Sequence, residues 1–209
     1  VRRNILNLRG KGYRPTIPMS MVPGEEKLFF QNITHTYYDL KPVMLAMNKI
    51  VSAYDQDYDW EEVYRQMTMI AEWYRDIGGA SKKPPFWLQF LRKTIETNYP
   101  RSKRTRFSCG AGHGSISIDC DGRIATCYRL FDVPEAQLGW VWGEIDEEAL
   151  YKFRHLVVEK CHKCTTHPCS VCWADNLQFG GLTDPNPRAC RWEKIRMKVC
   201  MEVFGWKPK

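Results

Sequence analysis

Residues 161–172 read CHKCTTHPCSVC, which places four cysteines within twelve residues. The four form two Cys-x-x-Cys pairs, and four residues separate one pair from the other. Cysteine pairs at this spacing are typical of metal sites, but a zinc ribbon separates its two pairs by a longer loop of roughly 15–20 residues. The pattern therefore favours thiols that are shared between two metal centres over a single tetrahedral site.

The cysteines as a whole also indicate metal binding. All nine lie between Cys109 and Cys200, and the first half of the chain has none. An odd number of cysteines, most of them in closely spaced pairs, disfavours a disulfide framework. The same pattern is typical of a metalloprotein in a reducing compartment. The sequence also has neither an apolar run of about 18 residues nor a signal peptide at its N-terminus, so we predict a cytoplasmic protein without a membrane partner.

Composition and charge narrow the class of protein. The 209 residues are 44% hydrophobic and 26% charged, which is sufficient for a buried core and excludes a disordered chain. The net charge is +7, and the one dense basic run is RSKRTR at 101–106. A short run of this kind is more typical of a solvated linker than of a nucleic-acid site, so nucleic acid is a disfavoured partner. We place a domain boundary here, between residues 1–105 and 106–209.

The first region alternates between strand and helix patterns. We expect strands over 15–22 and 42–47, and helices over 25–38, 60–77 and 84–99, the second of them capped by Asp59 and ended by Gly78 and Gly79. Units this short are typical of an α/β layer or barrel, but two strands cannot close a barrel. We expect the remaining strands to lie upstream of Val1 or in another chain.

The second region begins with a β-hairpin pattern. Residues 115–119 alternate, Asp121 and Gly122 predict a two-residue turn, and the chain returns over 123–127. The hairpin brings Cys127 near Cys109, so the two thiols can reach one metal centre. Cys120 lies at the turn, where a turn residue and a ligand are both open interpretations.

Two helices are expected around the cysteine-rich stretch. The first begins at Asp146 and leads into residues 161–172, and its expected buried residues are Leu150, Phe153, Leu156 and Val157. The second begins near Cys190 and contains Cys200 in its middle, where we expect a small buried hydrophobic residue.

The order of the cysteines resembles the seven-cysteine signature of the SPASM domain, the C-terminal extension of many radical S-adenosylmethionine (SAM) enzymes that modify peptides and proteins. The matching positions are Cys109, Gly122, Cys127, Cys161, Cys164, Cys169, Cys172 and Cys190. The family usually spaces its central cysteines Cys-x2-Cys-x5-Cys-x3-Cys, whereas the gaps here are two, four and two residues. The stretch CWADN at 172–176 also resembles members associated with ribosomal-peptide maturation.

This resemblance implies two auxiliary [4Fe-4S] clusters. Carried over position by position, Cys109, Cys127 and Cys172 would bind the first cluster. The ligands of the second would be Cys161, Cys164, Cys169 and Cys190. The first cluster would then keep an open iron for substrate or take Cys120 as a fourth ligand. No residue is assigned a catalytic role.

The first region resembles the last part of a radical SAM partial (β/α) barrel, which implies an α/β barrel portion followed by a small cysteine-rich α+β domain. The Cys-x3-Cys-x2-Cys loop that binds SAM and a third [4Fe-4S] cluster in this family does not occur in the 209 residues. The implied function is therefore the C-terminal portion of an oxidoreductase that crosslinks or oxidises a peptide or protein substrate. Its implied partners are that substrate and the N-terminal part of the same enzyme. Tyr128 follows Cys127, where the sulfatase-maturating branch has an aspartate base, so formylglycine formation is disfavoured.

Two other interpretations remain open. The same thiolates suit a zinc-stabilised module that binds nucleic acid or a peptide without SAM chemistry. The second interpretation is a protein that holds iron–sulfur clusters and recognises a peptide, but has lost SAM chemistry. Metal analysis separates the zinc module from both cluster proteins.

Overall fold

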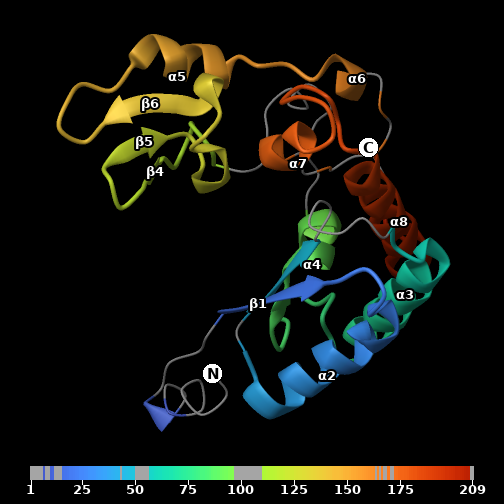
Figure 1. The fold of residues 1–209 in the computed structure, drawn as a ribbon. Coiled ribbons are helices and arrows are strands. Elements are labelled where there is room, and N and C mark those ends of the chain that lie inside the picture. Colours follow the sequence, from blue (N-terminus) through green and yellow to red (C-terminus); the bar gives the residue numbers. More distant parts are fainter. Residues whose placement is uncertain are drawn as a thin grey trace. The chain divides into compact units, whose positions relative to one another are not determined.

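The computed structural model describes residues 7, 10–11, 16–42, 44–49, 57–96, 110–162, 164, 166, 169 and 172–207, and within them the chain is mixed α and β (Figure 1). The chain forms two units. The first contains residues 1–99, 166–168 and 188–209, and the second contains 100–165 and 169–187. Cys109 and the basic run at 101–106 lie outside the described residues.

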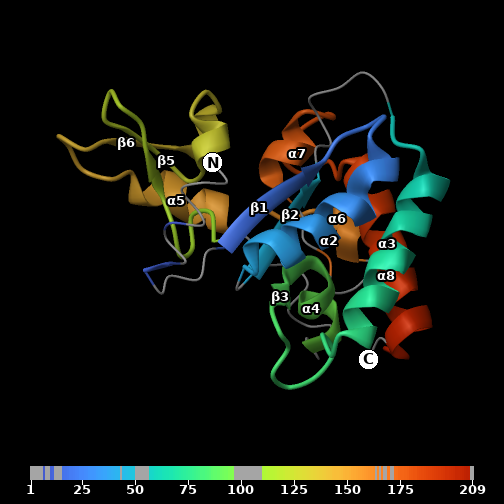
Figure 2. The ribbon, with the colours of Figure 1, turned by 90° about the horizontal axis from the view of Figure 1, so that it is seen from below.

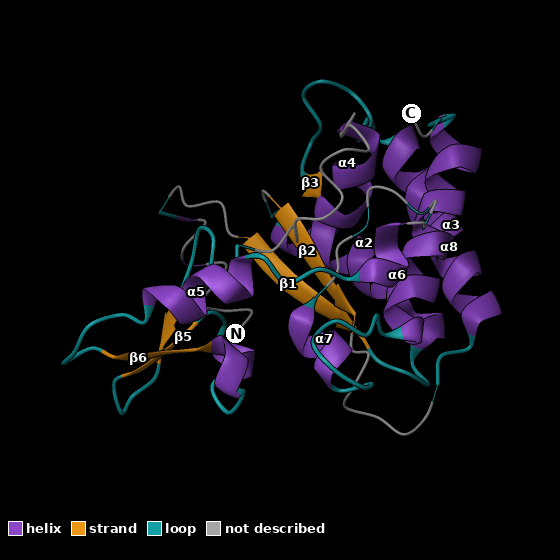
Figure 3. Cartoon of the chain, turned by 90° about the horizontal axis from the view of Figure 1, so that it is seen from above, coloured by secondary structure: helices purple, strands orange, loops and turns teal. Residues whose placement is uncertain are grey.

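Three parallel strands form the sheet of the first unit. They are β1 (Thr16–Met21), β2 (Met44–Lys49) and β3 (Trp87–Leu88), in the order β1-β2-β3. Between them lie the short 3-10 helix η1 (Glu26–Leu28), α2 (Phe29–Leu40) and α3 (Trp60–Asp76), and α4 (Gln89–Glu96) follows β3. Figure 3 shows the helices α2 and α3 on one side of β1 and β2. The predicted alternation of strands and helices is confirmed for these elements.

Helix α3 forms as its capping and spacing predict. The Asp59 carboxylate accepts a hydrogen bond from the Glu62 N–H at 3.1 Å, which satisfies one of the amides that a helix N-terminus leaves free. The apolar face is buried, and its residues are Trp60, Val63, Met67, Ile70 and Tyr74. Gly78, at φ +82°, turns the chain after the helix, and a Cβ at Gly79 would lie 2.4 Å from the Tyr74 ring. Both glycines are therefore needed where the sequence predicts the end of the helix.

The helix predicted from Pro84 is wrong in its first residues. Trp87 and Leu88 instead form β3, which pairs with Met44 and Leu45 of β2, and the helix begins only at Gln89. The buried Tyr74 hydroxyl donates to the Phe86 carbonyl at 2.9 Å and accepts from the Leu88 N–H at 3.4 Å. Sheet pairing and this hydroxyl satisfy the backbone here, so tertiary contacts override the helical periodicity.

The C-terminal helix α8 (Pro187–Phe204) packs in the core of the first unit. Figure 2 shows α8 alongside α3. Trp192, Val199 and Cys200 belong to the same buried cluster as the apolar face of α3, and the Trp192 ring lies 6.1 Å from that of Tyr58. Cys200 is fully buried, which confirms its predicted role as a small core residue. The sequence-based boundary grouped α8 with the cysteine-rich region, and the assignment of 1–105 and 106–209 to two named domains stays a prediction.

A buried ion pair anchors α8 in this core. The Arg196 guanidinium donates to the Glu193 carboxylate at 2.9 Å and to the Phe90 carbonyl at 3.1 Å, and both charged side chains are less than a tenth exposed. A buried charge is tolerated only when it is paired and hydrogen-bonded, which both partners achieve here. The pair therefore fixes the position of α8 against the start of α4.

A second sheet lies in the other unit. Its antiparallel strands are β4 (Ser117–Ile118), β5 (Arg123–Ala125) and β6 (Gln137–Trp140), with the 3-10 helices η3 (Tyr128–Leu130) and η4 (Pro134–Ala136) between β5 and β6. Three short helices follow, namely α5 (Glu147–Arg154), α6 (Glu159–His162) and α7 (Trp173–Leu177). None of the helices within the described part of the chain combines the length and the apolar content that a membrane span requires.

The predicted β-hairpin is confirmed, but its two-residue turn is wrong. The Asp119 N–H donates to the Arg123 carbonyl and the Gly122 N–H donates to the Asp119 carbonyl, both at 3.1 Å. The loop therefore has three residues, Cys120 to Gly122. Gly122 has φ +89°, so it supplies the left-handed residue that closes a three-residue hairpin loop.

Helix α5 begins as predicted and ends earlier than expected. The Asp146 carboxylate caps it by accepting the Ala149 N–H at 2.8 Å, and Phe153 is buried. The helix ends at Arg154, so Leu156 and Val157 lie beyond it and Val157 is 37% exposed. The prediction that Val157 lies on the buried side of this helix is therefore wrong.

Candidate functional site

The structure places six of the seven predicted thiol ligands. Cys127 precedes η3 in an extended conformation, Cys161 lies in α6, and Cys172 is the residue before α7. Cys164 and Cys169 lie between α6 and α7 in the second unit, and Cys190 lies in the first turns of α8 in the first unit. All six are half-buried, whereas Cys120 is exposed at the hairpin turn. Cys109 lies outside the described residues.

Three of these cysteines contact the same apolar core. Cys127, Cys161 and Cys172 all pack against the buried cluster of the second unit. Its members are Ala111, Leu130, Val133, Ala136, Phe153, Val158, Trp173, Ala174 and Leu182. The rings of Phe153 and Trp173 lie 5.4 Å apart within it. Residues that are up to 45 positions apart in the sequence therefore present their thiols to the same hydrophobic surface.

A complete ligand set is not formed by the described side chains. Among the residues that the structure describes, no group of three or more His, Cys, Asp or Glu side chains is arranged to hold a metal ion. Cys127, Cys161 and Cys172 thus share a core without converging on one point. The division of the seven cysteines into two ligand sets stays a prediction.

Cys172 is held beside a paired arginine and carboxylate. The Arg129 guanidinium donates from Nη1 to the Cys172 sulfur at 3.5 Å, and from the same nitrogen to Asp175 Oδ1 at 2.7 Å. The Asp175 side chain is only 7% exposed, so its carboxylate holds the arginine in a fixed place. A cationic donor is therefore positioned on the sulfur by a buried carboxylate.

The pKa of Cys172 reflects opposing effects. Burial raises the pKa of the Cys172 thiol above its ordinary value, and the Asp175 charge raises it further. The backbone N–H groups of Asp175 and Ala174 and the Arg129 charge act in the opposite direction, and burial prevails. Cys172 without a metal is therefore a neutral thiol, but it is surrounded by the donors that stabilise a thiolate once a metal replaces the proton.

Two buried asparagines fix α7 and its cysteine. Asn176 donates from Nδ2 to the Leu182 carbonyl at 2.9 Å, and its Oδ1 accepts the Asn186 N–H at 3.2 Å. Asn186 in turn donates to the Asp175 carbonyl at 3.0 Å. These bonds tie the loop after α7 back onto the helix, so the backbone of Asp175 is held by Asn186 while its side chain pairs with Arg129.

Sequence reasoning did not identify Arg129 or Asn186. Arg129 lies only two positions after Cys127, but its contact is with a cysteine 43 residues away, which spacing alone does not reveal. In the sequence, the stretch CWADN carries only a resemblance, whereas the structure shows that its Asp175 and Asn176 are buried and hydrogen-bonded.

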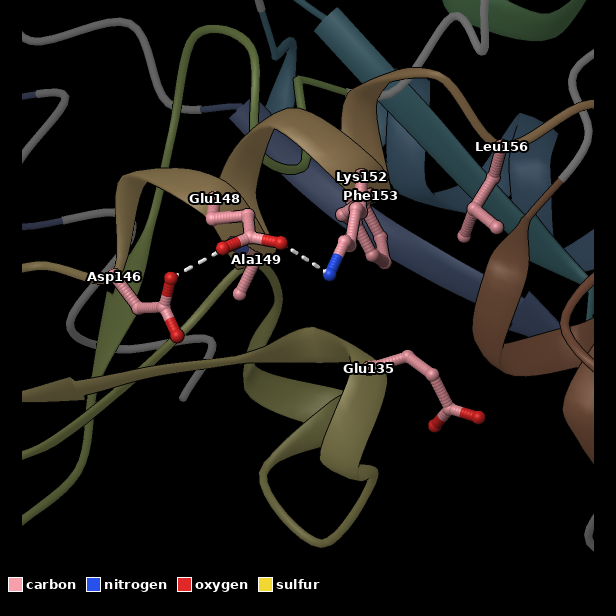
Figure 4. A pocket seen from close by; sticks show the side chains of 7 residues that line it. All are labelled: Glu135, Asp146, Glu148, Ala149, Lys152, Phe153 and Leu156. Atoms are coloured by element: carbon pink, nitrogen blue, oxygen red, sulfur yellow. Dashed lines mark hydrogen bonds and ion pairs between the residues drawn. The ribbon is translucent and has the colours of Figure 1, made fainter.

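A pocket lies beside the same core, because Phe153 and Leu156 contribute to both. Figure 4 shows the side chains of Glu148 and Lys152 on α5 facing the segment that carries Glu135. The cavity measures about 230 Å³, and its lining residues are Glu135, Asp146, Glu148, Ala149, Lys152, Phe153 and Leu156. The lining contains three carboxylates and one cation, Lys152. Lys152 already pairs with Glu148 at 2.6 Å, so the pocket is acidic. The Phe153 side chain lines this acidic pocket and also belongs to the core that the three cysteines contact.

No protein-family model matches the chain, and a comparison with curated proteins finds no significant match. The functional assignment therefore depends on the chain's own residues and on their arrangement.

Proposed function

We propose that this chain is the C-terminal portion of a radical SAM enzyme that crosslinks or oxidises side chains of a peptide or protein, and that its cysteines hold two auxiliary [4Fe-4S] clusters. The observation that carries the proposal is the gathering of Cys127, Cys161 and Cys172 on one apolar core, with Arg129 donating to the Cys172 sulfur. The resemblance of the seven cysteines to the SPASM signature supplies the reaction class.

The chemistry of the cysteines and of the residues around them is suited to iron–sulfur clusters. Clusters of this kind are bound by thiolates, and their properties depend on burial, on nearby charge and on hydrogen bonds to sulfur. The half-buried thiols and the guanidinium on Cys172 supply these features. The ligands we propose are Cys109, Cys127 and Cys172 for one cluster, and Cys161, Cys164, Cys169 and Cys190 for the other. Bound clusters would supply one-electron transfer beside a substrate.

The first unit would contribute part of the barrel that encloses the substrate. Its three parallel strands with intervening helices agree with the last part of a partial (β/α) barrel. We assign the binding of SAM and of a third cluster to a segment outside these 209 residues, because the sequence contains no Cys-x3-Cys-x2-Cys loop.

Metal analysis tests the proposal directly. We expect the anaerobically reconstituted chain to be brown and to bind about eight iron and eight sulfide ions, because two [4Fe-4S] clusters contain that number. Iron, sulfide and zinc would be measured per chain. Stoichiometric zinc without sulfide after anaerobic isolation would contradict the proposal and support the zinc-stabilised binding module instead.

A second prediction concerns Arg129. Replacing it by glutamine removes a positive charge and a hydrogen-bond donor from the Cys172 sulfur. Positive charge favours the reduced cluster, so its removal is expected to shift the reduction equilibrium about tenfold toward the oxidised form. For a one-electron couple this lowers the reduction potential by ~59 mV. The measurement is a redox titration followed by electron paramagnetic resonance.

Two controls accompany this measurement. Arg129→Lys keeps the charge, so its potential should lie between those of the wild type and Arg129→Gln. Arg123→Gln removes an arginine of the same unit that pairs with Asp119 and Asp132, and it should leave the potential unchanged. An unchanged potential in an iron-replete Arg129→Gln protein would show that Arg129 serves only to pair with Asp175.

A further inference from the structure

Several large apolar side chains are exposed near the hairpin turn of the second unit's sheet. Four exposed residues of β6 and the loop before α5 form what we call the indole rim, namely Trp140, Val141, Trp142 and Ile145. Trp142 is 84% exposed and Trp140 is 49% exposed. Strand register places Trp140 opposite Arg123, and the side chains of Val141 and Trp142 lie against Gly122 of the hairpin turn. Exposed apolar side chains that are bordered by polar residues commonly mark interaction sites.

The indole rim is held in place by backbone hydrogen bonds. The Val141 N–H donates to the Gly122 carbonyl at 2.9 Å, the Gly143 N–H to the Trp140 carbonyl at 3.0 Å, and the Asp146 N–H to the Leu138 carbonyl at 2.9 Å. The loop is therefore folded back along β6.

The position of Trp142 depends on the glycine of the hairpin turn. A Cβ at Gly122 would lie 2.9 Å from Val141 Cγ2 and 3.2 Å from Trp142 Nε1, so only glycine lets the two side chains rest on the turn. Trp142 is thus exposed and yet in contact with a fixed support. Binding surfaces commonly use aromatic side chains that are positioned in advance, because little conformational freedom is then lost on binding.

Charge around the indole rim indicates which partner fits it. Residues 116–123 and 140–148 contain six carboxylates and one arginine, in a chain whose net charge is +7. That arginine, Arg123, already pairs with Asp119 and Asp132. Asp121, Glu144 and Glu147 are exposed beside the rim. A partner with apolar and cationic side chains would complement this surface, and its cations could also stack on the exposed indoles.

The acidic pocket of α5 adjoins the end of this loop. Asp146 caps α5 and also lines the pocket, together with Glu135 and Glu148 (Figure 4). At about 230 Å³ the pocket is smaller than the roughly 300–1,000 Å³ of typical small-molecule sites, so it suits one side chain better than a whole cofactor. The apolar lining residues Phe153 and Leu156 fit the methylene stem of a lysine or arginine, whose charge would lie among the carboxylates.

We propose that the indole rim and the acidic pocket together form a docking surface for an extended peptide segment that carries lysine or arginine next to apolar residues. That this segment belongs to the modified substrate rests on the function proposed above, whereas the docking itself does not require SAM chemistry.

The test measures peptide binding to the whole chain. The probe is a fluorescein-labelled twelve-residue peptide of repeated Gly-Lys-Leu, and the comparison peptide has glutamate in place of lysine. We expect fluorescence anisotropy to show binding of the lysine peptide at least tenfold tighter than binding of the glutamate peptide. Affinity should decrease at least tenfold in Trp142→Ser and in the double variant Glu144→Gln/Glu147→Gln.

The matched control is Phe179→Ser, which removes another aromatic side chain of the second unit that is 60% exposed. It should change the affinity less than twofold, and circular dichroism would verify the folding of every variant. Equal binding of the two peptides, or equal losses in Trp142→Ser and Phe179→Ser, would overturn the proposal. So would self-association of the chain that Trp142→Ser abolishes, because a second copy would then be the occupant. Iron and sulfide measured on the same samples report separately on the proposed function.

Discussion

Cys164→Ala and Cys169→Ala are each expected to remove about half of the bound iron, whereas Cys200→Ala should leave the iron content unchanged. Cys164 and Cys169 belong to the ligand set proposed for one cluster, and a four-thiolate cluster does not tolerate the loss of a ligand without weakened binding. Cys200 lies fully buried in the first unit's core, beside Trp192 and Val199, so its loss affects packing only. The measurement is iron and sulfide per chain after anaerobic reconstitution.

The same substitutions should also differ in their effect on the free energy of unfolding. Binding of a metal centre contributes to the folding free energy of the region that holds it, so a lost cluster destabilises the second unit. Cys200→Ala instead removes one small buried side chain, and a cost of about 1 kcal/mol in the free energy of unfolding is expected. If Cys200→Ala lost as much iron as Cys164→Ala, the proposed ligand sets would be wrong.

Elements whose signals are local were predictable from the sequence. Helix α3 follows from the Asp59 cap, the spacing from Trp60 to Tyr74 and the two glycines that end it. The hairpin follows from alternation around an Asp-Gly pair, although its loop is one residue longer than expected. In both cases the determining residues lie within about one element's length of one another.

Features that depend on distant partners were not predictable. Strand β3 requires β2 and the Tyr74 hydroxyl, so its sequence alone resembled the start of a helix. The amphipathic pattern of α8 predicted a buried face but could not identify the core that the face contacts. Patterns along the chain specify which side of an element is apolar, and tertiary packing determines what covers it.

In the candidate site, too, local features were predictable from the sequence and contacts between distant residues were not. Cysteine spacing indicated metal binding, and the structure adds that Cys127, Cys161 and Cys172 share one core. The contact of Arg129 with Cys172 and the buried Asp175 arises from η3 and α7 coming together, which no spacing rule describes. The clusters themselves remain a proposal that iron and sulfide analysis decides.

The 209-residue chain, fully loaded with iron and given a strong reductant, is not expected to cleave SAM to 5′-deoxyadenosine. Reductive cleavage in this enzyme class requires an iron that chelates the amino and carboxylate groups of SAM, and the Cys-x3-Cys-x2-Cys loop that binds it does not occur in the sequence. A protein that combines this chain with a segment containing that loop, fused upstream or supplied as a separate chain, should produce 5′-deoxyadenosine. The product would be quantified by liquid chromatography and mass spectrometry.

Both arms of this experiment are informative. The control is the same combined protein with the three loop cysteines replaced by alanine, which should retain the auxiliary iron and lose the product. Product from the 209-residue chain above a no-protein control would show that an auxiliary cluster binds SAM itself. The cluster proposed to have three cysteine ligands would then be responsible, because three ligands would leave one iron open. An iron-replete combined protein that yields no 5′-deoxyadenosine would contradict the proposed enzyme and leave a cluster-bearing peptide-binding protein, whose binding surface the indole rim and the acidic pocket would supply.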